Sequence, residues 1–282
     1  MLSIMPDLKN EYLLNGRTER YVNDLERIVK RSGLGHKPLT ELSLLDFRHY
    51  SKFNDTTRNR YLSYLKIVLN YAVNEELIPK NPLRKWRKPK EQPRKNPLTL
   101  EDLEKIKAVA APHLKWAIEV AQNLGVRCGK TELFSLRWDQ VNYEYNFIHV
   151  YGRKTKKWRQ IPFTESFGKR LKEIQKQSTT SYICEYRTTT YEIARPLERI
   201  HKSWRTALRH ANLPYRCVFY DVRHLYATTL LNRGADVTSV SALLGHASVA
   251  MTVDVYGNAS MKSMRQAVSL LEQEPLISDD GV

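Results

Sequence analysis

The sequence predicts a mainly α-helical protein with a small β-sheet, divided into two domains. Apolar residues recur at helical spacing along most of the chain, whereas two neighbouring segments show the alternation of strands. The chain has 282 residues, more than the ~250 residues near which a single hydrophobic core stops growing. A proline-rich basic segment, residues 79–97, interrupts the helical pattern and separates the two domains.

The first domain is predicted to be a small helical bundle over residues 1–88. One helix covers residues 18–30, and its apolar face is formed by Val22, Leu25, Ile28 and Val29. A second helix begins after Ser43. A long third helix covers residues 56–77 and is stopped by Pro79, because the residue before a proline disfavours the helical conformation.

A basic linker follows the bundle, and we place it at residues 89–96. Prolines hold the surrounding segment open, and cations along an open chain can follow a phosphate backbone by releasing counterions. The other interpretation of the segment is a solvated tether. The residues interpreted as DNA-binding are Arg84, Lys85, Arg87, Lys88, Lys90, Arg94 and Lys95.

The second domain is predicted over residues 97–282, and its first helix begins where Thr99 and Asp102 can form a capping box. Segments 146–152 and 158–163 alternate as the strands of one hairpin. The tail of the chain is acidic. Further helices are predicted at 115–124, 130–137, 165–177, 192–211, 221–233, 237–244, 248–256 and 261–272.

Charge and composition narrow the partners and the compartment. The 46 Lys and Arg against 30 Asp and Glu leave a net charge of +16, which favours a polyanion such as nucleic acid. The sequence has no apolar stretch near ~20 residues and no charged-then-apolar start, so we expect a soluble cytoplasmic protein without a membrane partner. Three scattered cysteines fit a reducing compartment, and neither they nor the histidines have the spacing of a metal site.

Five separated motifs carry reactive side chains, and each alone has an ordinary structural explanation. They are Gly125-Val126-Arg127 with Glu132-Leu133, Lys154 eight residues before Pro162, Tyr220-Asp221-Val222-Arg223-His224 with Ala227-Thr228, Leu244-Gly245-His246, and Tyr256. In this order they resemble the boxes of the tyrosine recombinase and phage integrase family. The likeness covers the whole second domain, and the first domain with its linker resembles the family's helical, SAM-like core-binding domain.

The resemblance implies a helical core-binding domain plus a mixed α/β catalytic domain of tyrosine recombinase type. It implies a site-specific DNA recombinase or integrase that cleaves and rejoins DNA through a 3′-phosphotyrosyl intermediate and exchanges strands through a Holliday junction. The partners would be double-stranded DNA with specific recombination sites and a homo-tetramer on that DNA, with a monomer or weak oligomer when free. No metal, ATP or other cofactor is expected. The implied catalytic residues are Arg127, Lys154, Tyr220, Arg223, His246 and Tyr256.

These residue types suit transfer of a phosphodiester. Two guanidiniums, Arg127 and Arg223, can bind the non-bridging oxygens in bidentate fashion where negative charge develops. A lysine on a hairpin, Lys154, can protonate the leaving 5′ oxygen. His246 can donate a hydrogen bond to the same phosphate, while the Tyr256 hydroxyl attacks phosphorus.

The chain departs from the family pattern at two places. Tyr220 stands where the second box usually begins with histidine or sometimes lysine, and the first box has two residues more than usual between Arg127 and Glu-Leu. Arg137 is the competing arginine for the first box and is interpreted as structural. His224 is interpreted as orienting its helix or the neighbouring arginine.

Two other functions remain compatible with the sequence. A type IB topoisomerase uses similar residues but relaxes DNA without exchanging strands between duplexes. A catalytically inactive DNA-binding regulator is the other alternative, and Tyr220 is its motivation. The predicted last helix, residues 260–273, has an apolar side that can pack either on its own subunit or on a neighbouring one.

Overall fold

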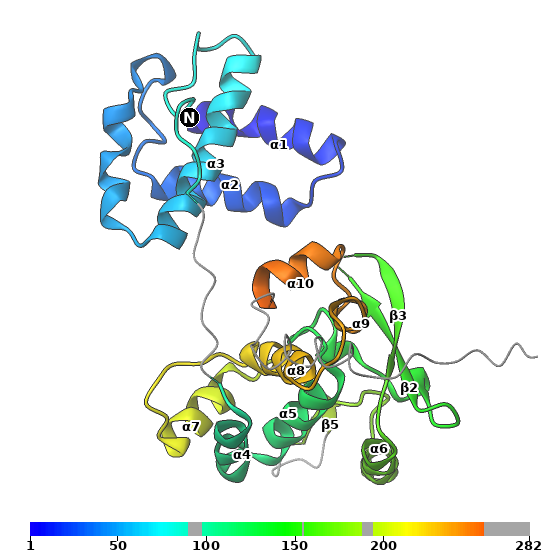
Figure 1. Ribbon diagram of the computed structural model, residues 1–282. Coiled ribbons are helices and arrows are strands. Elements are labelled where there is room, and N and C mark those ends of the chain that lie inside the picture. Colours follow the sequence, from blue (N-terminus) through cyan, green and yellow to red (C-terminus); the bar gives the residue numbers. More distant parts are fainter. Residues whose placement is uncertain (90–97, 154, 188–193, 257–282) are drawn as a thin grey trace, which may run out of the picture. The chain divides into compact units, whose positions relative to one another are not determined.

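The computed structural model describes residues 1–89, 98–153, 155–187 and 194–256. The chain forms two compact units, Met1–Pro93 and Arg94–Val282, and Figure 1 shows the elements of each. The helix predicted at 261–272 lies outside the described residues, as do Lys90, Arg94, Lys95 and Lys154.

The first unit consists of helices. They are α1 (Met5–Leu14), α2 (Glu19–Arg31) and α3 (Asp55–Asn74), with 3-10 turns at Leu2–Ile4, Leu39–Glu41 and Leu44–Lys52. The side chains of Thr18 and Asn54 accept hydrogen bonds from backbone N–H groups in the first turns of α2 and α3, which fixes where these helices begin. The helix predicted after Ser43 is a 3-10 helix, and α1 was missed by the sequence analysis.

The second unit is mainly helical with two small antiparallel sheets. Its helices are α4 (Leu100–Val109), α5 (Pro112–Leu124), α6 (Glu165–Gln177), α7 (His201–Ala211), α8 (Asp221–Asn232), α9 (Val237–Leu244) and α10 (Val249–Tyr256). The first sheet joins β1 (Val141–Asn142), β2 (Phe147–Gly152) and β3 (Lys157–Pro162) in chain order, and the second pairs β4 (Glu185–Arg187) with β5 (Ala194–Pro196). The predicted hairpin is therefore confirmed, with Ile148 opposite Ile161 at its buried centre.

Two predicted helices are wrong. Residues 130–137 form turns and one 3-10 helix, Leu133–Ser135, because the Glu132 carboxylate turns inward and binds the backbone N–H of Arg127. The helix expected at 192–211 begins only at His201. Upstream of it, Arg195 precedes a proline and pairs as β5 with β4, which a helix would forbid.

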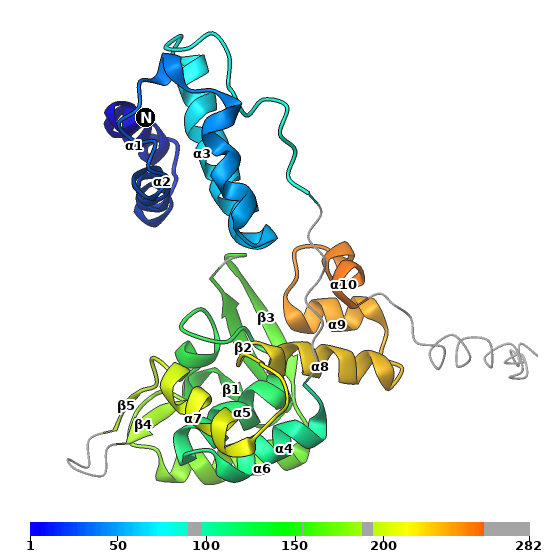
Figure 2. The same ribbon diagram turned by 90° about the vertical axis from the view of Figure 1, so that its left-hand side faces the viewer.

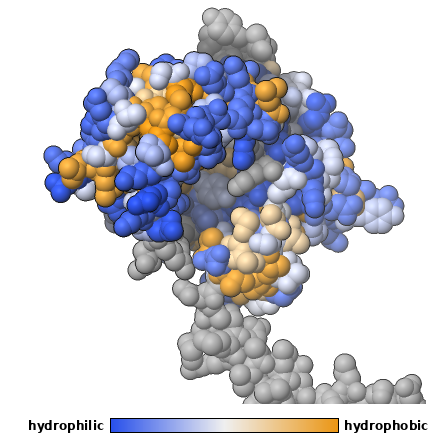
Figure 3. Space-filling model, turned by 90° about the horizontal axis from the view of Figure 1, so that it is seen from above, coloured by the Kyte–Doolittle hydropathy of each residue, from blue (hydrophilic) through white to orange (hydrophobic). Residues whose placement is uncertain are grey.

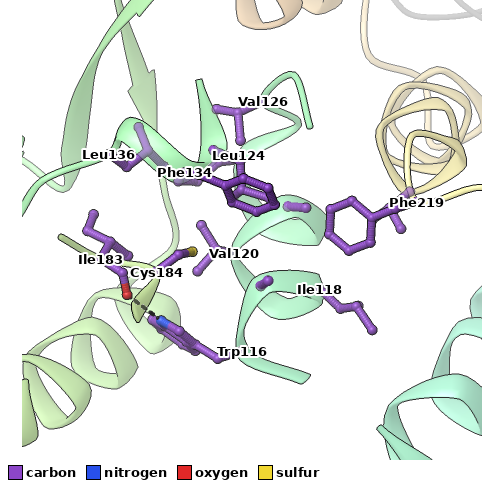
Figure 4. Close-up of a cluster of buried hydrophobic side chains, with 14 of the residues drawn as sticks. Trp116, Ile118, Val120, Leu124, Val126, Phe134, Leu136, Ile183, Cys184 and Phe219 are labelled. Carbon is purple, nitrogen blue, oxygen red and sulfur yellow. Dashed lines mark hydrogen bonds between the residues drawn. The ribbon is translucent and has the colours of Figure 1, made fainter. Parts of the chain in front are cut away.

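The hydrophobic core of the second unit surrounds α5, which packs beside α8 in both ribbon views (Figures 1 and 2). Figure 4 shows Ile118, Val120 and Leu124 of this helix among the buried side chains. Trp116 anchors the helix at its other end, since its indole Nε1 donates a buried hydrogen bond of 2.8 Å to the carbonyl of Ile183. This core holds the C-terminal end of α5 in place.

The surface in Figure 3 is mostly hydrophilic and carries separate hydrophobic patches. On α10 the side chains of Val249, Met251, Val253 and Val255 are exposed. In the part of the chain that the structure describes, no helix has the length and apolar character needed to span a membrane.

Replacing Trp116 by Phe tests the buried anchor of α5. The variant keeps an aromatic ring but leaves the Ile183 carbonyl without its donor, so the free energy of unfolding should fall by about 1 to 3 kcal/mol. Denaturation followed by circular dichroism measures this. The matched control is Trp158→Phe, because that side chain is 60% exposed on β3 and its loss should change stability by less than about 0.5 kcal/mol. Equal losses in the two variants would contradict the anchoring role.

Candidate active site

The site begins at the sharp turn that ends α5. Gly125 closes the helix in the left-handed conformation, with φ of 58°. A Cβ at this position would lie 2.3 Å from the ring of Tyr226 on α8, so the close packing of α5 and α8 requires glycine. The turn directs the following Arg127 away from the helix axis and into the site.

A buried carboxylate organises the arginines of the site. Glu132 is 1% exposed, and its carboxylate binds the Arg127 guanidinium at 2.5 Å and the Arg127 backbone N–H at 2.9 Å. Arg159 on β3 binds the same carboxylate through two nitrogens, at 2.6 and 3.2 Å. The nearest nitrogen of Arg223 lies 3.9 Å away. One anion thus holds together cations from three separate segments.

The C-terminal end of α9 binds the same three guanidiniums. Arg159 donates to the carbonyl of Leu243 at 3.0 Å, Arg223 to that of Leu244 at 2.5 Å, and Arg127 to that of Gly245 at 2.9 Å. These three bonds join consecutive carbonyls. The last carbonyls of a helix lack partners within it and carry the negative end of its dipole, so they attract cations.

Arg223, in the first turn of α8, is almost completely enclosed. Its side chain is 1% exposed, and it also donates to the carbonyl of Gly125 at 2.8 Å. Its Nε has no hydrogen-bond partner among the described residues. Burial lowers the pKa of this guanidinium from its ordinary value, and the charges of Arg127 and Arg159 add to that effect, while Glu132 opposes it.

His246 follows the left-handed cap of α9. The cap residue, Gly245, has φ of 64°, and a Cβ there would meet the Arg159 guanidinium at 2.9 Å. His246 Nδ1 lies 2.8 Å from the hydroxyl of buried Thr252 on α10. Burial, followed by the charges of the three arginines and of His224, lowers the pKa of His246 to about 4. The imidazole is therefore neutral at physiological pH.

Tyr256 ends α10 and its hydroxyl points at α8. The oxygen lies 2.6 Å from Nδ1 of His224, and the two rings are 5.6 Å apart. Burial raises the pKa of Tyr256 to about 12, although the charge of Arg223 acts in the opposite direction. The ring of Tyr256 also packs on the small apolar cluster that joins α8 to α9. This packing and the hydrogen bond hold the hydroxyl within the site.

Tyr220 stands immediately before α8, one turn ahead of His224. Its ring meets that of His224 edge to face at 5.1 Å, and 39% of the residue is exposed. The structure therefore brings Arg127, Arg223, His246, Tyr256 and Tyr220 into one neighbourhood. Lys154 lies outside the described residues.

Arg137 makes its contacts elsewhere in the second unit, and the described residues interpreted as DNA-binding belong to the first unit. Arg137 packs over the ring of Tyr182 and pairs with Asp139 at 3.4 Å, which agrees with its interpretation as a structural residue. Four of the residues interpreted as DNA-binding belong to the described part of the first unit, where they are exposed: Arg84, Lys85, Arg87 and Lys88.

Sequence reasoning missed Arg159 and underestimated His224. Arg159 had a detectable signal, because it is a charged residue two positions before Ile161 and therefore lies on the buried face of a strand of the predicted hairpin. His224 was interpreted as orienting its helix or the neighbouring arginine, whereas its ring contacts the hydroxyl of Tyr256, 32 residues away. No local sequence pattern predicts a contact between residues so far apart in the chain.

Replacing Glu132 by Gln tests the buried anion. Burial alone would raise the pKa of Glu132, but hydrogen bonds and charges from Arg159 and Arg127 outweigh it and lower that pKa. Removing the anion leaves the cations uncompensated, so the free energy of unfolding at neutral pH should fall by about 3 to 5 kcal/mol. A lowered folded-state pKa stabilises the protein above the ordinary glutamate pKa and ceases to do so in acid. Denaturation curves should therefore converge as the pH falls.

The control is Glu173→Gln, because Glu173 is exposed on α6 and pairs with its neighbour Arg170 at the surface. This variant should differ from the wild-type protein by less than about 0.5 kcal/mol at either pH. A loss in Glu132→Gln that is as large in acid as at neutral pH would contradict the assignment.

Comparison with known protein families and relatives agrees with the two-unit fold. Residues 96–263 match the phage integrase family, and residues 9–88 match the phage integrase SAM-like domain. A tyrosine recombinase XerC-like protein of Caldanaerobacter subterraneus subsp. tengcongensis is 27% identical over 89% of this chain and 76% of that protein. Tyrosine recombinase XerC of Chlamydia trachomatis serovar L2 is 28% identical over 77% of this chain and 70% of that protein.

Solved structures share the fold. A lambda integrase in a dimer bound to a COC′ core site has a TM-score of 0.74 and 20% identity, over 88% of this chain and 96% of that chain. The Tn1549 transposon integrase in complex with a circular intermediate DNA has a TM-score of 0.75 and 18% identity, over 96% of this chain and 100% of that chain. Since the family match spans more than half of the sequence, the chain belongs to the phage integrase family of tyrosine recombinases.

Proposed function

We propose that this protein is a site-specific DNA recombinase that breaks and rejoins DNA through a covalent 3′-phosphotyrosyl bond to Tyr256, with strand exchange through a Holliday junction. The single observation that carries this proposal is the position of the Tyr256 hydroxyl. It is in contact with an imidazole and within the field of Arg223, beside a cluster of guanidiniums. Such an arrangement serves a nucleophile that attacks an anionic phosphodiester.

The arginines are proposed to bind the scissile phosphate. Arg127 and Arg223 keep their charge and can each present two N–H groups to the non-bridging oxygens, where negative charge grows during attack. Their bonds to Glu132 and to the end of α9 hold them in place before the substrate arrives. Because Arg223 is 1% exposed, a phosphate oxygen reaches it only if neighbouring groups shift.

His246 and Lys154 complete the proposed chemistry. With a pKa of about 4, His246 is neutral at physiological pH. If Nδ1 accepts the hydroxyl hydrogen of Thr252, Nε2–H is left to donate to a phosphate oxygen. Lys154, which falls between β2 and β3 in the sequence, is proposed as the acid that protonates the leaving 5′ oxygen. No step requires a metal ion.

The partners proposed for this chain are double-stranded DNA with specific sites and three further copies of itself. A net charge of +16 supports capture of DNA, and the exposed cations at the end of the first unit are proposed to contact phosphates. Lambda integrase has been solved as a tetramer bound to a Holliday junction. Exposed apolar side chains on α10, such as Val253, support a contact between subunits.

A nicked suicide substrate tests the nucleophile. After cleavage of such a duplex the short fragment that carries the free 5′-hydroxyl diffuses away. The protein therefore remains covalently attached to DNA and runs slower in a denaturing gel. The wild-type protein should form this adduct in the presence of EDTA, and Tyr256→Phe should form none while still binding the duplex. The control, Tyr145→Phe, removes an exposed hydroxyl before β2 and should react like the wild type.

Two results would contradict the proposal. An adduct that survives in Tyr256→Phe would place the nucleophile elsewhere, and normal binding without any adduct would indicate a regulator. Exchange of strands between two differently labelled duplexes separates a recombinase from a topoisomerase, which only relaxes supercoils.

Replacing Arg127 by Lys tests the forked contact. A lysine keeps the charge but cannot bind two oxygens in one plane, so the rate of adduct formation should fall by about 10²- to 10³-fold. Arg137→Lys is the matched control, since Arg137 lies against Tyr182 and not in the site. If the two substitutions slow cleavage equally, Arg127 is not a phosphate ligand.

A further inference from the structure

The Tyr256 hydroxyl has one hydrogen-bond partner within the described part of the chain, and that partner is a base. Nδ1 of His224 lies 2.6 Å from the phenolic oxygen. This distance is that of a strong hydrogen bond between the nucleophile and a group able to take its proton. The family boxes found in the sequence do not explain this contact.

Tyr256 needs such a partner. Burial raises its pKa to about 12, and Arg223 does not offset this effect. A phenol with that pKa is ionised in about one molecule in 10⁵ at neutral pH. The proton must therefore leave the oxygen as the bond to phosphorus forms, and a positioned acceptor makes that transfer possible.

The other groups around the hydroxyl cannot take this proton. Arg223 is a permanent cation. His246, with a pKa of about 4, is a weak base, and its Nδ1 is engaged with Thr252. Tyr220 is itself a phenol, and its charge would raise the pKa of Tyr256 further. Among the described residues, Arg223 on α8 and Tyr220 just before it are the groups whose charges act on Tyr256, and His246 lies on the turn after α9.

We propose that His224 is the general base of this enzyme, accepting the proton of Tyr256 at Nδ1 during cleavage and returning it during rejoining. The proposal rests on the proposed function. In cleavage the bond from the Tyr256 oxygen to phosphorus forms, the bond from phosphorus to O5′ breaks, and O5′ takes a proton from the general acid. His224 becomes an imidazolium. In rejoining a 5′-hydroxyl attacks phosphorus and returns its proton to the conjugate base of the general acid. The bond from phosphorus to the Tyr256 oxygen breaks, and the imidazolium protonates that oxygen.

The proposal also assigns a role to the aromatic residue at the start of the second box. Tyr220 precedes His224 by one helical turn, and its ring packs edge to face against the imidazole at 5.1 Å. Residues four apart on a helix lie on the same face. Tyr220 is therefore a positioning residue that restrains His224. In this chain the base is His224, four residues after the first residue of the second box.

The test is His224→Asn. The asparagine amide can occupy the position of Nδ1 and form a hydrogen bond to Tyr256, but it does not titrate. Single-turnover adduct formation on the nicked substrate should be at least about 10²-fold slower at neutral pH. In the wild-type protein the rate should level off at the pH above which the histidine is neutral. In His224→Asn the rate should instead keep rising with hydroxide concentration. DNA binding and thermal unfolding should match those of the control, His210→Asn, which changes an exposed histidine on α7.

A second substrate separates the base from the acid. When sulfur replaces the bridging 5′ oxygen, the leaving thiolate needs no proton, so loss of a general acid is rescued and loss of a general base is not. Lys154→Ala should recover on this substrate, and His224→Asn should stay slow. Recovery of His224→Asn would overturn the proposal, and so would a wild-type rate and pH profile in that variant.

The outcomes also distinguish this inference from the proposed function. If the wild-type protein forms no adduct, the recombinase assignment itself fails. If the wild type forms an adduct that Tyr256→Phe abolishes while His224→Asn reacts normally, the nucleophile stands and only the assignment of the base is lost.

Discussion

The arrangement of the second unit depends on one buried anion. Glu132 has no contact with solvent through its side chain, yet it remains a carboxylate because Arg127 and Arg159 bind it directly. An unpaired charge at this depth would be strongly unfavourable, and so would three guanidiniums packed together without it. The carboxylate and the cations therefore stabilise one another, and each fixes where the others lie. A site for a phosphate anion can form beside cations that are already held in this way.

The same packing determines the acid and base properties of the remaining groups. The end of α9 supplies three carbonyls to the arginines, and α10, which packs on α9, brings Tyr256 to His224 of α8. Burial, together with the surrounding positive charge, lowers the pKa of His246 and makes it a neutral donor. It does not make Tyr256 acidic, because burial of the phenol has the larger effect on its pKa. Proton transfer must therefore depend on a specific contact and not on the field alone.

Much of the fold was predictable because its signals are local. The apolar spacing of residues 18–30 and the capping box at Thr99 predicted helices that the structure contains, and alternation identified the hairpin. The errors lie where a distant interaction outweighs the local pattern. Residues 130–137 have helical spacing, but the hydrogen bonds that Glu132 forms with Arg127 stabilise the structure more than another turn of helix would. The segment before His201 pairs with a strand that has no strong sequence pattern of its own.

The sequence by itself determined which chemical groups are present and in what order: permanent cations, imidazoles, a carboxylate and a phenol near the end of the described chain. The chemical nature of each group is a property of its own side chain and does not depend on contacts with other residues. Only the tertiary structure decided which groups touch, such as Tyr256 with His224, or Arg159 with Glu132. Burial and neighbouring charge then set which of these groups hold a proton, because both depend on segments that are distant along the chain.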